Sequence, residues 1–528
     1  MIAKSRYIEI YDTTLRDGAQ GMNVKFSLQD KISLTLRLDE FGIPFIEGGW
    51  PFSNPQDEEY FKAIKDYHLR QAKIVAFGST RKKGVRPEED GNLNAIVKSD
   101  VDYATLVGKS WILHVKRVLR VKPEENLDMI YDSISYLKSH GMRVIFDAEH
   151  FYDGYKDDPE YAVRVLEVAR EAGADRIVLC DTNGGALTHE FYEITKRMCK
   201  RFGDCVGVHC HNDSGLAVAN SLMAVVAGAV HVQGTINGIG ERCGNADLCQ
   251  IIPALEVKMG YRALSSSSNG LRGLRGLSLF VYDLIGVKPN PYQPYTGQYA
   301  FAHKAGTHSD GVMKVSRAYE HIDPEIVGND RFIAVSEIAG RSAIVYKATK
   351  LGLSLKKDDA VVLKALRMVK ELEASGKMFE EADGSLYLLL LKAMDAYRPH
   401  FEVLSWAVTS GTGEEGLRSV CTVKLKVKDK IVTSVAEGVG PVHAQDLALT
   451  RALKPEYPHL ERVSLVNYRV SIVGRSEGTA SVVRVLIEFK GDGECWMTAG
   501  SSANILEASM QALIEGYEYY LHKRELKQ

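Results

Sequence analysis

The first 260 residues alternate short runs of β-forming residues with longer stretches whose apolar positions recur at helical spacing. The eight runs lie at 7–12, 44–49, 73–78, 103–108, 143–149, 176–182, 206–211 and 232–238. The stretch DPEYAVRVLEVAREAGA (158–174) is typical of the segments between them, with a glycine near its end. Eight such units in about 250 residues predict an α/β fold, a (β/α)8 TIM barrel. A doubly wound open sheet is the alternative, but no G-x-G-x-x-G follows the first run.

Polar and ionisable residues stand where most of these runs end. In a barrel of this kind the chemistry is carried at the carboxyl ends of the strands, so these residues are expected to meet at one mouth. They are Arg16, Asp17, Glu47, Glu149, Thr182, His209 and His211, with Asn237 and Asn245 nearby.

The segment VGVHCHNDSG (206–215) places two histidines two positions apart. In an extended strand His209 and His211 point the same way, whereas Cys210 points to the opposite face. Together with Asp17 they offer two imidazoles and one carboxylate, which suits a divalent cation. Zinc fits this set best, and Mn²⁺ or Mg²⁺ would also accept it. We interpret Cys210 and Cys243 as small buried packing residues.

The remainder of the chain has a different organisation. A polar stretch at 262–275 is expected to leave the barrel, and amphipathic patterns at 358–376 and within 377–400 predict helices. Pro399 marks the start of a β-rich tail. We therefore predict three segments: the barrel at 1–270, a mostly helical linker subdomain at 271–400, and an α+β domain at 401–528.

The tail contains an internal repeat at an offset of 60 residues, in which VKLKV (423–427) corresponds to VRVLI (483–487). Gly440 and Gly500 correspond as well, and each copy predicts strands, a glycine turn and a helix rich in small residues. Two similar halves would form a cleft related by a pseudo-twofold axis.

Composition limits the classes of function. Hydrophobic residues make up 45% and charged residues 25%, which is typical of a globular protein. A net charge of −2 argues against nucleic acid as a partner, and no apolar run is long enough to span a membrane. The basic segment STRKKGVRP (79–87) is a solvated loop or a contact for the phosphates of an anionic cofactor. Eight scattered cysteines and no apolar signal core predict a cytoplasmic protein with reduced thiols.

Four segments carry a resemblance to a known family: DTTLRDGAQ (12–20), EGGWPFSNP (47–55), VHCHNDSGLAVANS (208–221) and GTINGIGERCGNADL (234–248). They resemble the metal-dependent barrel enzymes that include isopropylmalate, homocitrate and citramalate synthases together with related lyases. The resemblance implies that Asp17, His209 and His211 bind the divalent cation and that Asn245 adds an amide oxygen.

The same resemblance implies roles in binding and catalysis. Arg16 would hold negative charge on the substrate oxygens, and Glu47 would orient Arg16. Glu149 matches the catalytic acid of the family, and Thr182 would hold the substrate carboxylate. Asp147 occupies a position that lines the keto-acid pocket, where relatives carry a small or apolar residue.

Residues 299–328 resemble the post-barrel subdomain that distinguishes the condensing enzymes from the lyases. His308 matches the proposed general base and Tyr319 its supporting hydroxyl, whereas His303 is better explained as a structural or surface histidine. Segments 438–449 and 500–513 resemble the regulatory domain of isopropylmalate and citramalate synthases, where an end-product amino acid binds. A purely structural dimerisation domain is the alternative.

The resemblance implies a Claisen-type condensation of acetyl-CoA with a 2-keto acid, followed by thioester hydrolysis. The runs at 47–61 and 146–159 resemble the citramalate synthase branch, which implies pyruvate as substrate, isoleucine as effector and a homodimer. A 2-isopropylmalate or homocitrate synthase using a larger keto acid remains open. So does a metal-dependent acyl-CoA lyase or aldolase on the same barrel.

Overall fold

The computed structural model describes residues 6–265, 270–304, 306–413, 416–473 and 478–525. Residues 266–269 of the predicted polar connection lie outside this description. The chain divides into two compact units, Met1–Phe301 with Ile322–Asp330, and Ala302–His321 with Arg331–Gln528. The division into three segments at 270 and 400 stays a prediction. Among the described residues, no helix combines the length and the apolar character needed to cross a membrane.

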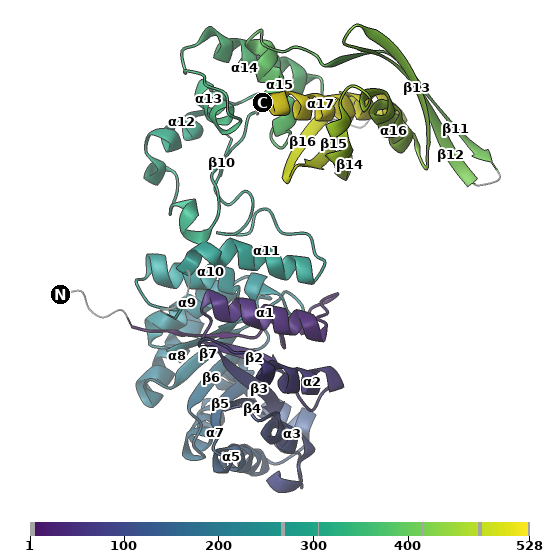
Figure 1. The fold of residues 1–528 in the computed structure, drawn as a ribbon. Helices are drawn as coiled ribbons and strands as arrows, with labels where there is room; N and C mark the ends of the chain where they lie inside the picture. Colours follow the sequence, from purple (N-terminus) through teal and green to yellow (C-terminus); the bar gives the residue numbers. More distant parts are fainter. Residues whose placement is uncertain (1–5, 266–269, 305, 414–415, 474–477, 526–528) are drawn as a thin grey trace. The chain divides into compact units, whose positions relative to one another are not determined.

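The first unit is built on a closed barrel of eight parallel strands in sequential order, which confirms the (β/α)8 prediction over the open sheet (Figure 1). The strands are β1 Glu9–Asp12, β2 Phe45–Gly49, β3 Lys73–Ser79, β4 Tyr103–Lys109, β5 Arg143–Glu149, β6 Arg176–Asp181, β7 Val206–Cys210 and β8 His231–Gly234. The barrel closes where β1 pairs with β8, with Ile10 opposite Val232. The last predicted run was too long, because β8 ends at Gly234 and residues 236–238 form a 3-10 turn.

Helices connect successive strands and cover the outside of the barrel. The longer ones are α1 Leu28–Phe41, α2 Pro55–Ala63, α3 Gly91–Ser99, α5 Pro123–Ser139, α7 Pro159–Glu171, α8 Thr188–Phe202 and α9 Ala217–Ala227. Shorter or terminal ones are α4 Ile112–His114, α6 Phe151–Asp157, α10 Leu248–Pro253 and α11 Leu274–Leu284. Local sequence fixes their ends: α1 begins at a capping box of Ser27 and Asp30 and ends at Gly42 in the left-handed conformation.

Strand alternation separates two layers of apolar side chains. Val144, Phe146 and Ala148 of β5 pack outward among the helices, whereas Ile145 belongs to a separate cluster inside the barrel. In β7, Val208 and Cys210 likewise pack in the outer layer. The side chains at 209 and 211 therefore point into the barrel, as the sequence predicts.

The second unit begins with helices and short strands around a core of its own. These elements are β9 Ala302–His303, α12 Gly306–Lys314, β10 Phe332–Ile333, α13 Arg341–Lys350, α14 Ala360–Ala374 and α15 Asp383–Ala393. Both α14 and α15 match predicted helices. Helix α15 is buried on nearly every side, because it packs against α14, α17 and β16.

The tail consists of two similar halves, each a three-stranded antiparallel sheet followed by a helix (Figure 1). The first half is β11 Phe401–Gly413, β12 Gly416–Val427, β13 Lys430–Gly438 and α16 Pro441–Leu453. The second is β14 Ser464–Ile472, β15 Val483–Gly491, β16 Glu494–Ser502 and α17 Ile505–Glu525. The predicted repeat is therefore real, although Gly500 lies within β16 rather than in a turn. A Cβ on Gly500 would lie 1.9 Å from the Ala508 carbonyl oxygen, so this glycine permits α17 to approach the sheet.

Candidate active site

A cavity of about 770 Å³ lies at the carboxyl ends of the barrel strands. Residues from or just after seven of the eight strands, β1 to β7, line it, as expected for this fold. Those at the strand ends are Arg16, Asp17, Lys109, Asp147, Glu149, Thr182, His209 and His211. The basic segment after β3 reaches the same cavity through Arg81, Lys82 and Lys83.

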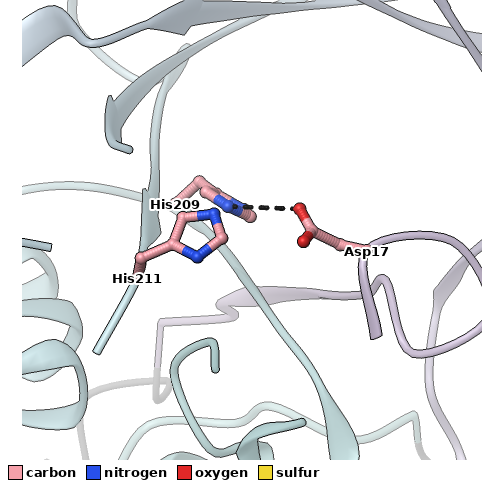
Figure 2. Close-up of side chains that lie close together, drawn as sticks. All are labelled: Asp17, His209 and His211. Carbon is pink, nitrogen blue, oxygen red and sulfur yellow. Dashed lines mark ion pairs between the residues drawn. The ribbon is translucent and has the colours of Figure 1, made fainter. Parts of the chain in front are cut away.

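Asp17, His209 and His211 come together as predicted. One ligand atom from each lies within 4.8 Å of the others, and Figure 2 shows both imidazole rings beside the carboxylate. The Nε2 atom of His209 is 3.6 Å from Oδ2 of Asp17, and all three residues are buried. This spacing is short enough for one cation to contact all three groups.

Asn245 completes this cluster. Its Nδ2 donates hydrogen bonds to Oδ1 of Asp17 at 3.3 Å and to the Ile239 carbonyl at 3.1 Å. Its Oδ1 is buried and has no hydrogen-bond partner among the described residues. An amide oxygen left free beside two imidazoles and a carboxylate fits a divalent cation. Asn237, in contrast, is occupied by Ser278 of α11: its Nδ2 donates to the Ser278 carbonyl at 2.9 Å, and its Oδ1 accepts from the Ser278 hydroxyl at 2.5 Å.

The protonation states of these groups suit a metal. Burial lowers the pKa of His209 to about 3 and also lowers the pKa of His211. Burial alone would raise the pKa of Asp17, but the charge of Arg16 outweighs it and the pKa falls to about 2. Two neutral imidazoles and one carboxylate are the forms that coordinate a cation.

A glutamine that sequence reasoning missed orients His209. Nδ1 of His209 lies 3.0 Å from Oε1 of Gln233, whose Nε2 donates to Oδ1 of Asp147 at 3.0 Å. This chain of bonds places the imidazole proton on Nδ1 and leaves Nε2 facing Asp17. Gln233 is fully buried in β8, and a polar residue directly after Val232 in a predicted barrel strand was the available signal.

Arg16 is held by Glu47, as the sequence predicts. Its Nε donates to Oε2 of Glu47 at 2.6 Å, and its Nη1 donates to Oδ2 of Asp17 at 3.0 Å. The guanidinium also lies 3.8 Å from the centre of the Phe77 ring. Burial alone would lower the pKa of Arg16, but the charges of Glu47 and Asp17 raise it, so the residue is a permanent cation.

The loop after β1 owes its shape to its own polar residues. The buried carboxylate of Asp12 accepts from the backbone N–H of Thr14 at 3.0 Å and from its hydroxyl at 2.8 Å. Thr13 donates to Glu47 and accepts from the backbone N–H of Asp17 at 3.3 Å. The sequence DTT thereby fixes the turn that presents Arg16 and Asp17.

The remaining cavity residues lie on the side of β5 and β6. Burial and the charge of Glu47 raise the pKa of Asp147 to about 8, so this carboxyl is largely protonated at neutral pH. Thr182 accepts a hydrogen bond from the backbone N–H of His150 at 2.9 Å. Glu149 forms an ion pair with Lys109, a second residue that sequence reasoning missed, although it stands at the end of β4.

His308 and Tyr319 belong to the second unit, and their roles stay predictions. His308 is exposed on α12, and its ring centre is 4.9 Å from that of Tyr319. Nε2 of His303 lies 3.2 Å from Oε1 of Glu320, in line with the interpretation of His303 as a structural histidine.

Two cysteines were expected to be buried. Cys210 is fully buried, but Cys243 is exposed, so the packing interpretation of Cys243 was wrong. Cys243 follows the exposed residues Glu241 and Arg242 in a loop, where no packing constraint applies.

Comparison with known proteins supports the same picture. Residues 7–271 match the HMGL-like family, 295–377 the homocitrate synthase post-HMGL domain-like family, and 380–521 the LeuA allosteric (dimerisation) domain. An (R)-citramalate synthase of Sulfolobus acidocaldarius is 53% identical over 100% of this chain and 98% of the relative. One from Geobacter sulfurreducens is 48% identical over 98% of both chains. A 2-isopropylmalate synthase of Methanocaldococcus jannaschii is 33% identical over 98% of this chain and 95% of the relative. The chain therefore belongs to the family of citramalate and isopropylmalate synthases.

Proposed function

We propose that the chain is an (R)-citramalate synthase, an acyltransferase that condenses acetyl-CoA with pyruvate and hydrolyses the thioester to citramalate and CoA. The observation that carries this proposal is the shared cavity in which Asp17, His209 and His211 adjoin Arg16. The names of the relatives at 53% and 48% identity support pyruvate as the keto acid.

The residues fit a divalent cation held by Asp17, His209 and His211, with Asn245 as a further oxygen ligand. Such a cation, when bound, supplies Lewis-acid polarisation of the keto carbonyl. We expect zinc from the two imidazoles, with Mn²⁺ or Mg²⁺ as the other candidates.

We assign to Arg16 the stabilisation of the negative charge that develops on the keto oxygen as the new carbon–carbon bond forms. Glu47 and Asp17 fix its guanidinium before substrate arrives, so little reorganisation is needed. Loss of such a preorganised donor costs about 10²–10³ in rate.

The keto acid is assigned to the space between Asp147 and Thr182. A protonated Asp147 does not repel the substrate carboxylate, and the Thr182 hydroxyl proton is free to be donated because its oxygen accepts from His150. We assign the phosphates of acetyl-CoA to the basic segment after β3, where Lys82 and Lys83 are exposed beside the same cavity.

Proton transfer needs a base and an acid. We assign removal of a methyl proton of acetyl-CoA to His308, supported by Tyr319, because an imidazole is a common general base for such a proton transfer. Glu149, paired with Lys109, is assigned a part in the proton relay of thioester hydrolysis.

The tail is assigned to regulation and dimerisation, in keeping with its match to the LeuA allosteric (dimerisation) domain. We propose isoleucine as the effector and a cytoplasmic homodimer as the working form. Isoleucine should shift the melting temperature or the activity; if neither isoleucine nor leucine changes either quantity, the regulatory assignment is wrong.

The choice of keto acid is tested by CoA release from acetyl-CoA against pyruvate, 2-ketobutyrate, 2-ketoisovalerate and 2-ketoglutarate. Pyruvate should be used far better than the others. A preference for 2-ketoisovalerate would support the isopropylmalate alternative, which is considered because a 2-isopropylmalate synthase is 33% identical to this chain. If none of the four keto acids supports CoA release, the lyase or aldolase alternative would be favoured.

A further inference from the structure

A second cluster of metal-ligating side chains lies in the tail. His400, Glu518 and His522 each place one ligand atom within 4.8 Å of the others. Their side chains are 7%, 1% and 9% exposed. Desolvation is costly for each of these ionisable groups, so their burial together calls for a physical explanation.

The fold brings these residues together from both ends of the tail. Glu518 and His522 are four residues apart on α17 and therefore share one face of that helix. His400 directly precedes β11, 118 residues earlier in the chain than Glu518.

The two distances from Glu518 fit one tetrahedral ion. Nδ1 of His400 is 2.9 Å and Nε2 of His522 is 3.6 Å from the same atom, Oε2 of Glu518. Two atoms that each lie ~2.0–2.1 Å from a tetrahedral zinc are roughly 3.3 Å apart, and the two distances bracket this value.

Hydrogen bonding within the cluster accounts for His400 but not for His522. The Nε2 atom of His522 is buried and has no hydrogen-bond partner among the described residues, since 3.6 Å to Glu518 is too long. A buried imidazole nitrogen without a partner is unfavourable, and a cation between it and Glu518 would satisfy both.

The surrounding groups are arranged as they are around known metal ligands. Oε1 of Glu518 accepts from the backbone N–H groups of His400 at 2.9 Å and Phe401 at 3.3 Å, which fixes the carboxylate and leaves Oε2 to the cluster. Nε2 of His400 lies 3.0 Å from Oε1 of Glu525, so this ring can donate outward while Nδ1 faces inward. A carboxylate behind a ligating histidine orients the ring and raises its basicity.

We propose that His400, Glu518 and His522 form a second divalent-cation site, of the zinc class, with water as the fourth ligand and Glu525 supporting His400. Two imidazoles and one carboxylate favour zinc over magnesium or calcium. The ion would tie the start of β11 to the end of α17 and so hold the two ends of the tail together.

The test counts zinc in the full-length protein. Chelated protein is equilibrated with Zn²⁺, unbound metal is removed, and bound zinc per chain is measured. We expect two zinc ions in the unchanged protein, one in His522→Gln and one in His211→Gln, which lacks a ligand of the barrel site. His443→Gln changes an exposed histidine of the same unit and should leave two. Equal counts in His522→Gln and the unchanged protein would overturn the proposal, whatever the barrel binds.

A second variant guards against a folding defect in His522→Gln. The Glu525 side chain is 67% exposed, so Glu525→Gln leaves the packing intact while removing the charge behind His400. Zinc affinity of the tail site, measured in the His211→Gln background, should fall about 10- to 100-fold. An unchanged affinity would contradict the geometry proposed here.

Discussion

Replacing Glu47 by Gln is the substitution that best separates positioning from general stability. Glu47 is fully buried and accepts from Tyr11 at 2.7 Å, from Thr13, and from Arg16 at 2.6 Å. A hydrogen bond to a charged acceptor contributes about 1 kcal/mol more than a neutral one, so three such bonds account for about 3 kcal/mol. Removal of one partner of a buried ion pair costs about 3–5 kcal/mol, which agrees with that figure.

Two measurements are needed for this variant. The melting temperature of the barrel unit should fall by about 6–10 °C, at about 2 °C per kcal/mol for a unit of this size. The specificity constant kcat/KM for pyruvate should fall about 10²-fold, because Arg16 is no longer fixed where charge develops.

The matched control is Glu9→Gln at the opposite, amino-terminal end of the strands. Glu9 holds Arg176 through two bonds of 2.7 and 2.9 Å, so its loss should also lower the melting temperature. The specificity constant of Glu9→Gln should remain unchanged, because stability and not chemistry is carried at that end. The positioning role of Glu47 is refuted if Glu47→Gln keeps the full specificity constant, or if the specificity constant falls as far in Glu9→Gln as in Glu47→Gln.

Three further predictions concern the metal, pH and the tail. Gln233→Met removes the acceptor of the His209 Nδ1 proton, and metal affinity should fall about 10- to 100-fold by calorimetric titration. Burial would raise the pKa of Glu9, but His231 and Arg176 outweigh it and the folded pKa is about 2, so the unfolded chain binds the proton more readily. Glu9 therefore contributes about 3 kcal/mol to the free energy of unfolding above pH 4.5, and this contribution should be lost progressively as the pH falls toward 2. Urea unfolding at a series of pH values should show this loss in the unchanged protein but not in Glu9→Gln. Gly500→Ala should destabilise the tail in a thermal scan because its Cβ meets a carbonyl oxygen, whereas Gly440→Ala, with no atom within 4 Å of its Cβ, should not.

Local patterns were sufficient to predict the barrel and the inward direction of the two histidines. Strand alternation alone places His209 and His211 on one face and Cys210 on the other, and the structure has this arrangement. The convergence of Asp17 with them follows from the rule that all strand ends of a parallel barrel meet at one rim.

Contacts between strands that are distant in sequence could not be predicted. The bond between Gln233 and His209 depends on the register of β7 against β8, and the pairing of Lys109 with Glu149 on that of β4 against β5. The raised pKa of Asp147 likewise follows from burial beside Glu47, which no sequence pattern reports. The repeat revealed two halves of the tail but not that Gly500 serves close packing, since a glycine in a strand and one in a turn look alike in sequence.

The most direct test of the account is product formation from acetyl-CoA and pyruvate, with and without metal. CoA and citramalate should appear in equal amounts, the rate should be lost after chelation, and addition of a divalent cation should restore it. CoA release without citramalate, or a rate that chelation leaves unchanged, would contradict a metal-dependent condensation at Asp17, His209 and His211.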